Sequence, residues 1–434
     1  MQLEKYMKNY KAELPRNQKL YNYYIGKHDI LSRVLPDKTK SNNKLVANYP
    51  HYIVSQATGF MISTPIAYLS TENDKEYLDD LERIFFINDE EDVNAEIVKN
   101  MVIYGKSYEV LWIDREAQTR FTQYSPLEMH VEIDDRDNIL CAFKPYTVED
   151  AEGTKTEFVE VYDSDGIRYF KKVGGTYQEQ IDKFKPHHFN EIPVIIHKNN
   201  DEQLGDFEMW ISLIDGINKL LSDSQNEIEA FSNAFLSITN AQGTTDEDIT
   251  RMKQDGVLLL PPDAKAEWLI KNINSQYQND HFEKLDDLIH TQSATPKLTS
   301  EQFASNLSGT AIKTKLQGLI NKTATRERKL GKSLRKRIRL VTKILNLKGK
   351  DYDPYTIRFQ FSRNIPSNEN DITDQIVKLQ NLIDRETLLS WHPKIENAAQ
   401  VIEKYKEEQP DINLDEMFND INKQLEAPRD NNNE

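Results

Sequence analysis

One long basic segment, Gly309–Leu347, constrains this chain more than any other stretch. Between Lys313 and Lys343 it holds twelve Lys or Arg residues and one acid, Glu327, a net charge of +11. Its apolar residues recur at helical spacing, at Ile312, Leu316, Leu319, Ile320, Leu330, Leu334, Ile338, Val341 and Leu345. At about 100° per residue they fall within one arc roughly 120° wide, and most cations fill the rest. The pattern predicts one helix, roughly 55 Å long at about 1.5 Å per residue, with an apolar stripe and a broad cationic face.

This basic segment lies in an acidic chain of 434 residues with a net charge of −16. The remainder therefore carries −27, which argues against a protein that coats nucleic acid over its whole surface. The length allows roughly two to four domains. Cys141 is the only cysteine, which leaves no disulfide or thiolate metal site within the chain and suits synthesis in a reducing cytoplasm. We expect no signal peptide in the first residues and no membrane-spanning run of about 18 apolar residues.

The first half of the chain predicts helices followed by an antiparallel sheet. Helical patterns occupy residues 1–35, the segment after Asn48 and two helices within 74–104. From Gly105 the apolar period changes to that of short strands separated by turn residues, and Ile192–His197 is expected to close the meander. The predicted strands are 108–114, 128–134, 140–146, 157–163 and 167–173.

A second long helix is predicted from Gly205 to about Thr239, with Asp206 as its N-cap. From Asp206 to Phe235 it holds six acids against one lysine. The rest of the chain predicts short elements joined by polar loops. They are strands at 257–261 and 266–273, an acidic helix at 279–292, a polar loop at Ser293–Ser308, a strand at Tyr355–Phe361, two or three short helices within 370–407, and a disordered tail from Gln409.

Motifs for nucleotide binding are incomplete. Gly105-Lys106-Ser107 and Gly331-Lys332-Ser333 both end like a phosphate-binding loop. That loop requires a further glycine five positions earlier, where this chain has Asn100 and Arg326.

Motifs for metal and nucleophilic chemistry are incomplete as well. His187-His188 and His197 do not have the spacing of zinc ligands, and no second histidine completes a ligand pattern with Asp286-Asp287 and His290. No G-x-S-x-G nucleophile motif occurs. We therefore expect no enzymatic activity, no cofactor and no metal.

Several stretches resemble portal proteins of tailed bacteriophages, and most closely the family found in phages with long non-contractile tails. The stretches are 101–114, 192–206, 203–238, 295–340 and 382–408. The most specific piece is Asn-Leu-Ser-Gly-Thr-Ala, residues 306–311, at the entry to the basic helix. The resemblance covers the chain from about residue 45 to 408.

The resemblance implies a ring oligomer, usually of twelve subunits, around a DNA channel at one capsid vertex. The implied fold is α+β, with long stem and wing helices, an antiparallel β-rich wing, a small α/β clip and a helical crown. The implied divisions are a wing at 1–205, a stem helix at 206–239, a clip at 240–275, a stem helix at 276–292, a tunnel loop at 293–308, the long basic helix and a wing strand at 309–368, a crown at 369–408 and a disordered tail at 409–434.

The implied function is to package and eject double-stranded DNA, within the virion and after assembly in the host cytoplasm. The implied partners are further copies of this chain, double-stranded DNA, the terminase large subunit, a head-completion or adaptor protein, the scaffold and the major capsid protein, with no membrane.

Three groups of residues are expected to make these contacts. The tunnel loop would face DNA through Lys297, Thr299, Ser300, Glu301, Gln302, Ser305 and Asn306. The basic helix would contact a neighbouring subunit through Arg326, Arg328, Lys332, Arg335, Arg337 and Arg339. The clip would bind terminase and adaptor through Asp246, Asp248, Arg251, Lys253 and Trp268.

Electrostatics agrees with this assignment. Every phosphate that a protein neutralises strengthens DNA binding through counterion release, so a sliding channel favours acidic stem helices and a loop whose only cation is Lys297. The acidic helices and the basic helix also suit contact between subunits, because opposite patches set register and head-to-tail contacts close rings.

Two other functions remain open from the residues alone. A metal-dependent nucleic-acid-processing enzyme would hold phosphates with the basic helix and use a carboxylate pair, and would cleave in the presence of Mg²⁺. A basic amphipathic helix could instead dock to a membrane surface, although the polar remainder and the lack of exposed aromatic anchors disfavour this.

Overall fold

The computed structural model describes residues 3–231, 235–240, 245–255, 265–269, 275–298, 309–363 and 376–390, with positions 395, 398, 401–402 and 404–405. The chain divides into two compact units, Met1–Leu298 with Leu316–Asn364, and Thr299–Lys315 with Ile365–Glu434. The second unit includes the start of the long helix α9 and the short helix α11 (Arg385–Ser390). The sheets and most of the helices belong to the first unit.

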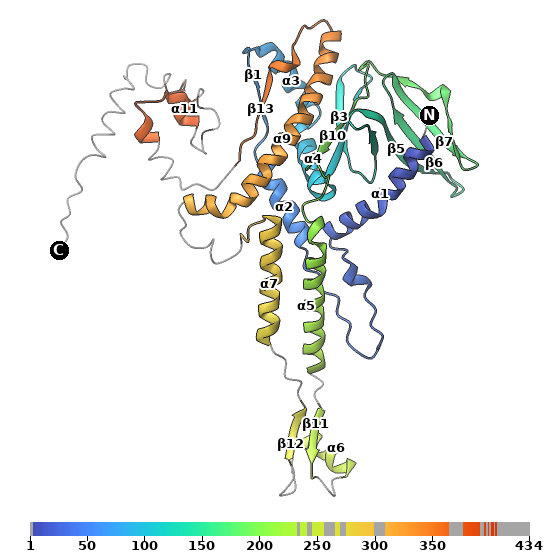
Figure 1. The fold of residues 1–434 in the computed structure, drawn as a ribbon, viewed down its shortest axis with the longest axis vertical. Coiled ribbons are helices and arrows are strands. Elements are labelled where there is room, and N and C mark those ends of the chain that lie inside the picture. Colours follow the sequence, from blue (N-terminus) through green and yellow to red (C-terminus); the bar gives the residue numbers. More distant parts are fainter. Residues whose placement is uncertain are drawn as a thin grey trace, which may run out of the picture. The chain divides into compact units, whose positions relative to one another are not determined.

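The first unit begins with helices, continues with most of the strands and ends with long helices (Figure 1). The helices are α1 (Leu3–Tyr24), α2 (Tyr49–Ile62), α3 (Lys75–Phe86), α4 (Glu90–Tyr104), α5 (Ile211–Phe231), α6 (Asp246–Asp255), α7 (Ser275–Ser293) and α9 (Gly309–Leu347). The strands are β1 (Ala67–Ser70), β2 (Lys106–Ile113), β3 (Thr119–Tyr124), β4 (His130–Ile133), β5 (Ile139–Glu149), β6 (Lys155–Tyr162), β7 (Gly166–Val173), β8 (Thr176–Glu179), β9 (Lys185–Pro186), β10 (Val194–Lys198), β11 (Phe235–Thr239), β12 (Lys265–Leu269) and β13 (Ile357–Gln360). The predicted α+β class is confirmed.

The long basic helix is confirmed with its predicted bounds, since α9 runs from Gly309 to Leu347 without interruption. Its apolar stripe is divided between two hydrophobic cores. Leu330 and Leu334 pack in a core with residues of α2, α4 and α5. Ile338 and Val341 pack in a second core with α3 and with strands β2, β3 and β10. The helix α9 therefore connects the two largest cores of the first unit.

The predicted single meander is two separate sheets. Strands β4 to β8 pair in sequence order, with β9 added to β7, and α1 covers one face of this sheet through Leu3, Met7 and Tyr10. Strands β10, β2 and β3 form a three-stranded sheet. The prediction that Ile192–His197 closes the meander is wrong, because β10 pairs with β2 instead. Strand β3 was not predicted, since its polar residues hide the alternation of Thr119 and Phe121 toward the interior.

The predicted helix from Gly205 to Thr239 is wrong at both ends. A 3-10 turn, Glu208–Trp210, precedes α5, and residues Phe235–Thr239 are strand β11, antiparallel to β12. A short apolar run such as FLSIT fits helical spacing as well as strand spacing, so periodicity alone could not separate the two. The predicted strand at 257–261 lies outside the described residues. Of the short helices predicted within 370–407, the structure describes α11, while residues 370–375 and most of 391–407 lie outside the described residues.

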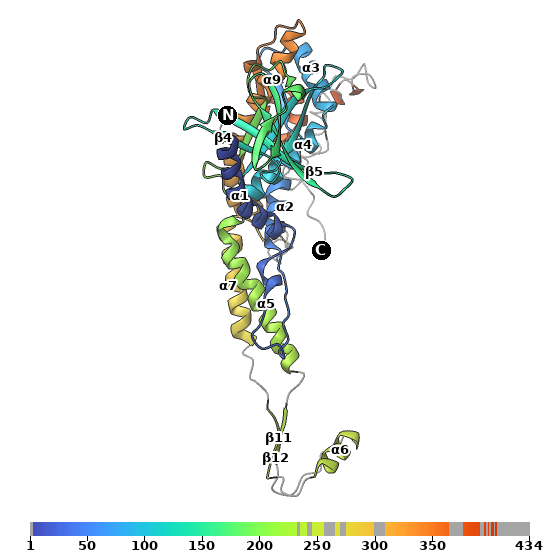
Figure 2. The ribbon, with the colours of Figure 1, turned by 90° about the vertical axis from the view of Figure 1, so that its right-hand side faces the viewer.

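Helices α5 and α7 lie side by side and antiparallel, as both views show (Figures 1 and 2). Gln278 of α7 donates a hydrogen bond to Glu227 of α5 (2.8 Å). Each helix carries four acids and one lysine, a net charge of −3. We refer to α5 and α7 together as the stem hairpin.

The left-handed residue Gly105, which ends α4, is required for close packing. Its φ is +87°, and a Cβ atom there would lie 2.0 Å from the carbonyl oxygen of Gln203. We predict that Gly105→Ala destabilises the fold by clearly more than the roughly 1–2 kcal/mol that a left-handed alanine costs. The midpoint of urea unfolding measures the effect.

Gly153 supplies the matched control, since its φ is +82° and no atom lies within 4 Å of a Cβ built there. Gly153→Ala should lower the free energy of unfolding only by the cost of placing an alanine in the left-handed conformation. Equal losses for the two variants would show that the contact with Gln203 does not limit the fold.

Candidate functional site

Six of the cations of α9 lie on two opposite sides of the helix. Arg328, Lys332, Arg335 and Arg339 follow one another at i, i+4, i+7 and i+11, which places them on one face at about 100° per residue. Arg328, Lys332 and Arg335 are exposed. We call these four residues the cationic stripe. Arg326 and Arg337 project to the opposite side, where α9 meets the cores.

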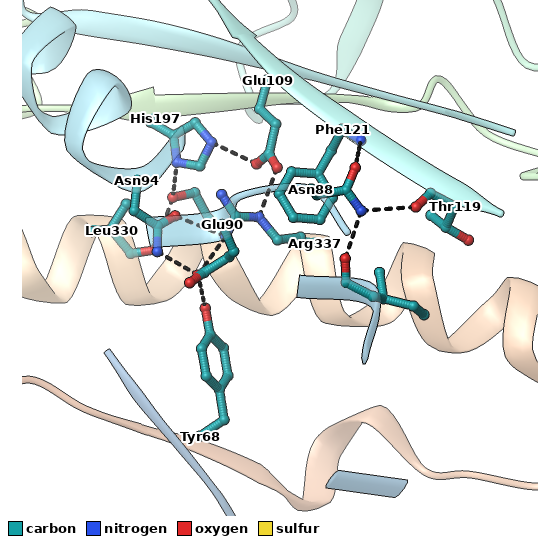
Figure 3. A network of polar contacts seen from close by, with 12 residues as sticks. Tyr68, Asn88, Glu90, Asn94, Glu109, Thr119, Phe121, His197, Leu330 and Arg337 are labelled. Atoms are coloured by element: carbon teal, nitrogen blue, oxygen red, sulfur yellow. Dashed lines mark hydrogen bonds and ion pairs between the residues drawn. The ribbon is translucent and has the colours of Figure 1, made fainter. Parts of the chain in front are cut away.

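Arg337 is the centre of a buried polar network (Figure 3). Its side chain is 0% exposed. Nε donates to Glu109 Oε1 (2.7 Å), and Nη1 donates to Glu90 Oε1 (3.0 Å) and to Asn94 Oδ1 (2.8 Å). The guanidinium also lies over the ring of Phe121, 4.8 Å from its centroid. One cation of α9 therefore joins the helix α4 to the strands β2 and β3.

Further partners complete the network around the two carboxylates. His197 of β10 lies between Glu109 Oε2 (3.0 Å) and Ser333 Oγ (2.7 Å), and Tyr68 donates its hydroxyl to Glu90. Burial alone would raise the pKa of Glu109, but the Arg337 guanidinium and His197 together outweigh burial and lower that pKa. Burial lowers the pKa of His197. Arg337 and Glu109 are thus held as a buried ion pair.

A second buried cation, Arg326, joins α9 to the start of the stem hairpin. Its Nη2 donates to Asp206 Oδ2 (2.6 Å), and its Nε donates to Asn199 Oδ1 (2.7 Å). Lys322 lies 3.0 Å from the same Asp206 oxygen and donates to the carbonyl of Ser293, the last residue of α7 (3.1 Å). We call Asp206, Lys322 and Arg326 the stem joint. The predicted N-cap role of Asp206 is wrong, because its carboxylate is engaged by α9.

The expectation that Arg326 and Arg337 contact a neighbouring subunit is therefore wrong. Their side chains are 1% and 0% exposed within a single chain, and acids of that same chain bind them. A guanidinium with this degree of burial has no surface to offer a partner. Glu90, Glu109 and Asp206 were missed because their partners lie far away in the sequence. The one available signal was that both arginines project beside the apolar arc of the helix.

The start of the predicted tunnel loop is anchored to α2. The Tyr52 hydroxyl donates to the carbonyl of Pro296 (2.6 Å) and accepts from the amide of Leu298 (3.2 Å). Lys297 binds Asp286 and Asp287 of α7, the latter at 2.5 Å. Desolvation would lower the pKa of Lys297, but its bonds to the two carboxylates raise it. The expected cation of the loop is thus neutralised by the stem hairpin. Its other predicted DNA-facing residues, Thr299, Ser300, Glu301, Gln302, Ser305 and Asn306, lie outside the described residues.

Comparison with known proteins identifies the family. The model of the family "Phage portal protein, SPP1 Gp6-like" matches residues 3–413. The chain belongs to this family.

Individual relatives agree with the family match. The portal protein of Bacillus phage SPP1 is 23% identical over 94% of this chain and 83% of its own length. The portal protein of Clostridium phage phiCD119 is 21% identical over 97% of this chain and 99% of its own length. A chain of a solved structure, the neck of an empty GTA particle computed with C6 symmetry, aligns with a TM-score of 0.48 at 11% identity, over 79% of this chain and 89% of that one.

The predicted clip of this portal-family chain begins with a reciprocal helix cap. Thr245 donates its amide (3.0 Å) and its hydroxyl (2.7 Å) to the Asp248 carboxylate, while the Asp248 amide donates to the Thr245 hydroxyl (3.3 Å). These bonds lower the pKa of Asp248. Asp246 and Arg251 are exposed, and the side chains of Lys253 and Trp268 are not among those described. At least one of the expected partner-binding residues thus also stabilises α6.

The features that suggested catalysis have structural partners. Lys106 donates to Glu13 (2.9 Å), and His290 lies 3.3 Å from Asp286. Within the described ranges, no group of three or more His, Cys, Asp or Glu side chains could hold a metal ion. No helix in the same ranges has the length and apolar character needed to cross a membrane.

Replacing Arg337 should be strongly destabilising. Arg337→Met leaves the buried carboxylates of Glu90 and Glu109 without a counter-charge, and breaking a buried pair in this way costs about 3–5 kcal/mol. Arg335→Met is the matched control on the exposed side of the same helix, where a change should stay within about 0.5 kcal/mol. Urea unfolding of the two variants measures the difference. Similar losses at both positions would contradict the proposed role of the network.

The stem joint should make the stability of the fold fall at acidic pH. Burial would raise the pKa of Asp206, but Arg326 and Lys322 lower it from 3.8 to about 2. A carboxyl with a lowered pKa stabilises the folded state above pH about 4, and this contribution is lost as the pH falls to about 2. For Asp206 the contribution to the free energy of unfolding is about 2 kcal/mol. The stability gap between the wild type and Asp206→Asn should therefore narrow over this pH range in urea unfolding. A constant gap down to pH 2 would contradict the assignment.

Proposed function

We propose that the chain assembles into a ring whose central channel carries double-stranded DNA into and out of the phage capsid at one vertex. The observation that supports this most is the stem hairpin, two antiparallel acidic helices in a chain of the portal family. In such a ring the stem hairpins of successive subunits would surround the DNA.

The charges of the stem hairpin suit a wall along which DNA moves. Asp280, Glu283 and Asp287 of α7 are exposed, and Lys297 is neutralised by Asp286 and Asp287. DNA would therefore meet few cations there, and each phosphate left unpaired keeps its counterions and adds no binding energy. This is the opposite of a grip on DNA and favours passage over retention.

The outer partners follow from the same assignment. We propose that the clip, with Asp246, Asp248, Arg251, Lys253 and Trp268, meets the terminase large subunit and later a head-completion or adaptor protein. The tunnel loop would line the narrowest part of the channel. The wing would contact scaffold and major capsid protein, with assembly in the host cytoplasm. Nothing among the described residues favours the alternative of a metal-dependent enzyme.

The assembled protein and its channel charge provide the test. Electron microscopy of the purified protein should show rings with a central opening. Rings that carry Asp280→Lys and Glu283→Lys should bind double-stranded DNA about ten-fold or more tightly near 50 mM salt, with a steeper loss of binding as salt rises. The reason is that the reversed residues would release phosphate counterions.

A variant with the same change in charge elsewhere is the control. Glu152→Lys with Asp182→Lys reverses two exposed acids in the connections of the sheet formed by β4 to β9 and should leave DNA binding much closer to that of the wild type. Protein that stays monomeric across a range of salt would contradict the ring. Rings whose DNA binding changes equally in both variants would contradict the acidic channel wall.

A further inference from the structure

An open groove lies beside α3 and the start of α4. Its volume is about 800 Å³, and apolar side chains such as Ile66, Leu78 and Phe86 line it. Phe86, at the end of α3, is 83% exposed. Acids surround this apolar floor. They are Asp79, Glu82, Asp89, Glu91 and Asp92, and we call the whole feature the acidic groove.

The five carboxylates are exposed. Across the part of the chain that the structure describes, none of them takes part in a salt bridge. Five like charges around an exposed phenylalanine repel one another, so a cationic partner would stabilise them. Glu90 lines the same groove but differs, because Arg337 binds it from the inside.

The cationic stripe has the complementary property. Arg335 has no salt bridge to the described part of the chain, and Arg328 donates only to the Thr325 hydroxyl (3.1 Å). Lys332 is 72% exposed and lies 3.7 Å from Asp137. Exposed pairs at such a distance contribute little. The fourth stripe residue, Arg339, differs because it donates to Glu191 (2.7 Å). Within the described part of the chain, Arg328 and Arg335 of the stripe and the five acids of the groove therefore have no salt bridge.

These two surfaces face opposite directions. Arg337 reaches Glu90 at the inner side of the acidic groove, and it follows Arg328 by nine residues. At about 100° per residue this is half a turn around α9, so the stripe points away from the groove. A basic patch on one side and an acidic patch on the other cannot pair within one chain. Such patches can pair head to tail between copies, and a head-to-tail contact is the geometry that closes a ring.

We propose that the acidic groove of one subunit receives the cationic stripe of the next copy of this chain. Phe86 would be covered in that contact, and the charges would set the register between neighbours. The proposal rests on the ring proposed above and assigns its subunit boundary to these residues. It replaces the acids of the stem hairpin as the partners expected for the basic helix.

Two complementary variants test this boundary. The stripe variant carries Arg328→Glu, Lys332→Glu and Arg335→Glu, and the groove variant carries Asp79→Lys, Glu82→Lys and Glu91→Lys. Each variant alone places like charges across every boundary, so each should lose rings. A mixture of the two should form rings again, since each boundary then joins opposite charges. Because the two variants must alternate, mass measurement should find only even subunit numbers with equal shares of each.

The controls separate this proposal from the ring itself. A variant with Glu149→Lys, Glu152→Lys and Asp182→Lys has the charge of the groove variant and should still form rings. If the wild type forms no rings, the proposed function fails. If the wild type and both variants form rings, only this boundary is wrong. Misfolding of either variant would not be rescued by mixing.

Cross-linking gives an independent measurement that needs no charge reversal. A chain with Glu82→Cys and Arg335→Cys, treated with a short bismaleimide, should give a ladder of covalently joined subunits, while either single replacement should give at most isolated pairs. The native Cys141 is buried and should not react. Rings of the double variant that yield no ladder would overturn the assignment.

Discussion

The structure depends on one buried cation, the Arg337 guanidinium, held between Glu109 and Glu90. Removing three charges from water is costly, and only close ion pairs and hydrogen bonds offset that cost. Their arrangement links a strand of the three-stranded sheet, a helix of the first core and the long helix α9 at one point. The stem joint contains a second buried ion pair of this kind, between Arg326 and Asp206. Through these two contacts, the position of the stem hairpin is coupled to the helices and sheet strands that pack around α9.

Much of the fold could be predicted because its signals are local. The bounds of α9 followed from apolar spacing alone, and so did the acidic helix α7. The predictions that were wrong required information from distant residues. Strand β10 pairs with β2, whose residues lie 84 to 92 positions earlier, and FLSIT forms β11 because Lys265–Leu269 pairs with it. Periodicity cannot show which partner a short apolar segment will find.

The candidate site could be predicted in part for the same reason. A single sign of charge along α9 suggested one role for all its arginines, yet two of them are internal. Their angle beside the apolar arc was readable from the sequence, but the acids that receive them were not. For the exposed arginines, contact with a neighbouring subunit stays a prediction, and we propose the acidic groove as their partner. The predicted tunnel loop includes residues 299–308, which the structure does not describe, so its contact with DNA stays a prediction.

We propose that α9 serves two purposes: one side holds its own subunit together, and the other side meets the next subunit. A cryo-electron microscopy map of the assembled ring, at a resolution that shows side chains, tests this most directly. We expect Arg326 and Arg337 to lie inside each subunit, bound to Asp206, Glu109 and Glu90. We expect Arg328, Lys332 and Arg335 to lie at the boundary, opposite the neighbour's acidic groove. A map with Arg337 bound to acids of another subunit, or with the cationic stripe facing solvent or DNA, would contradict it.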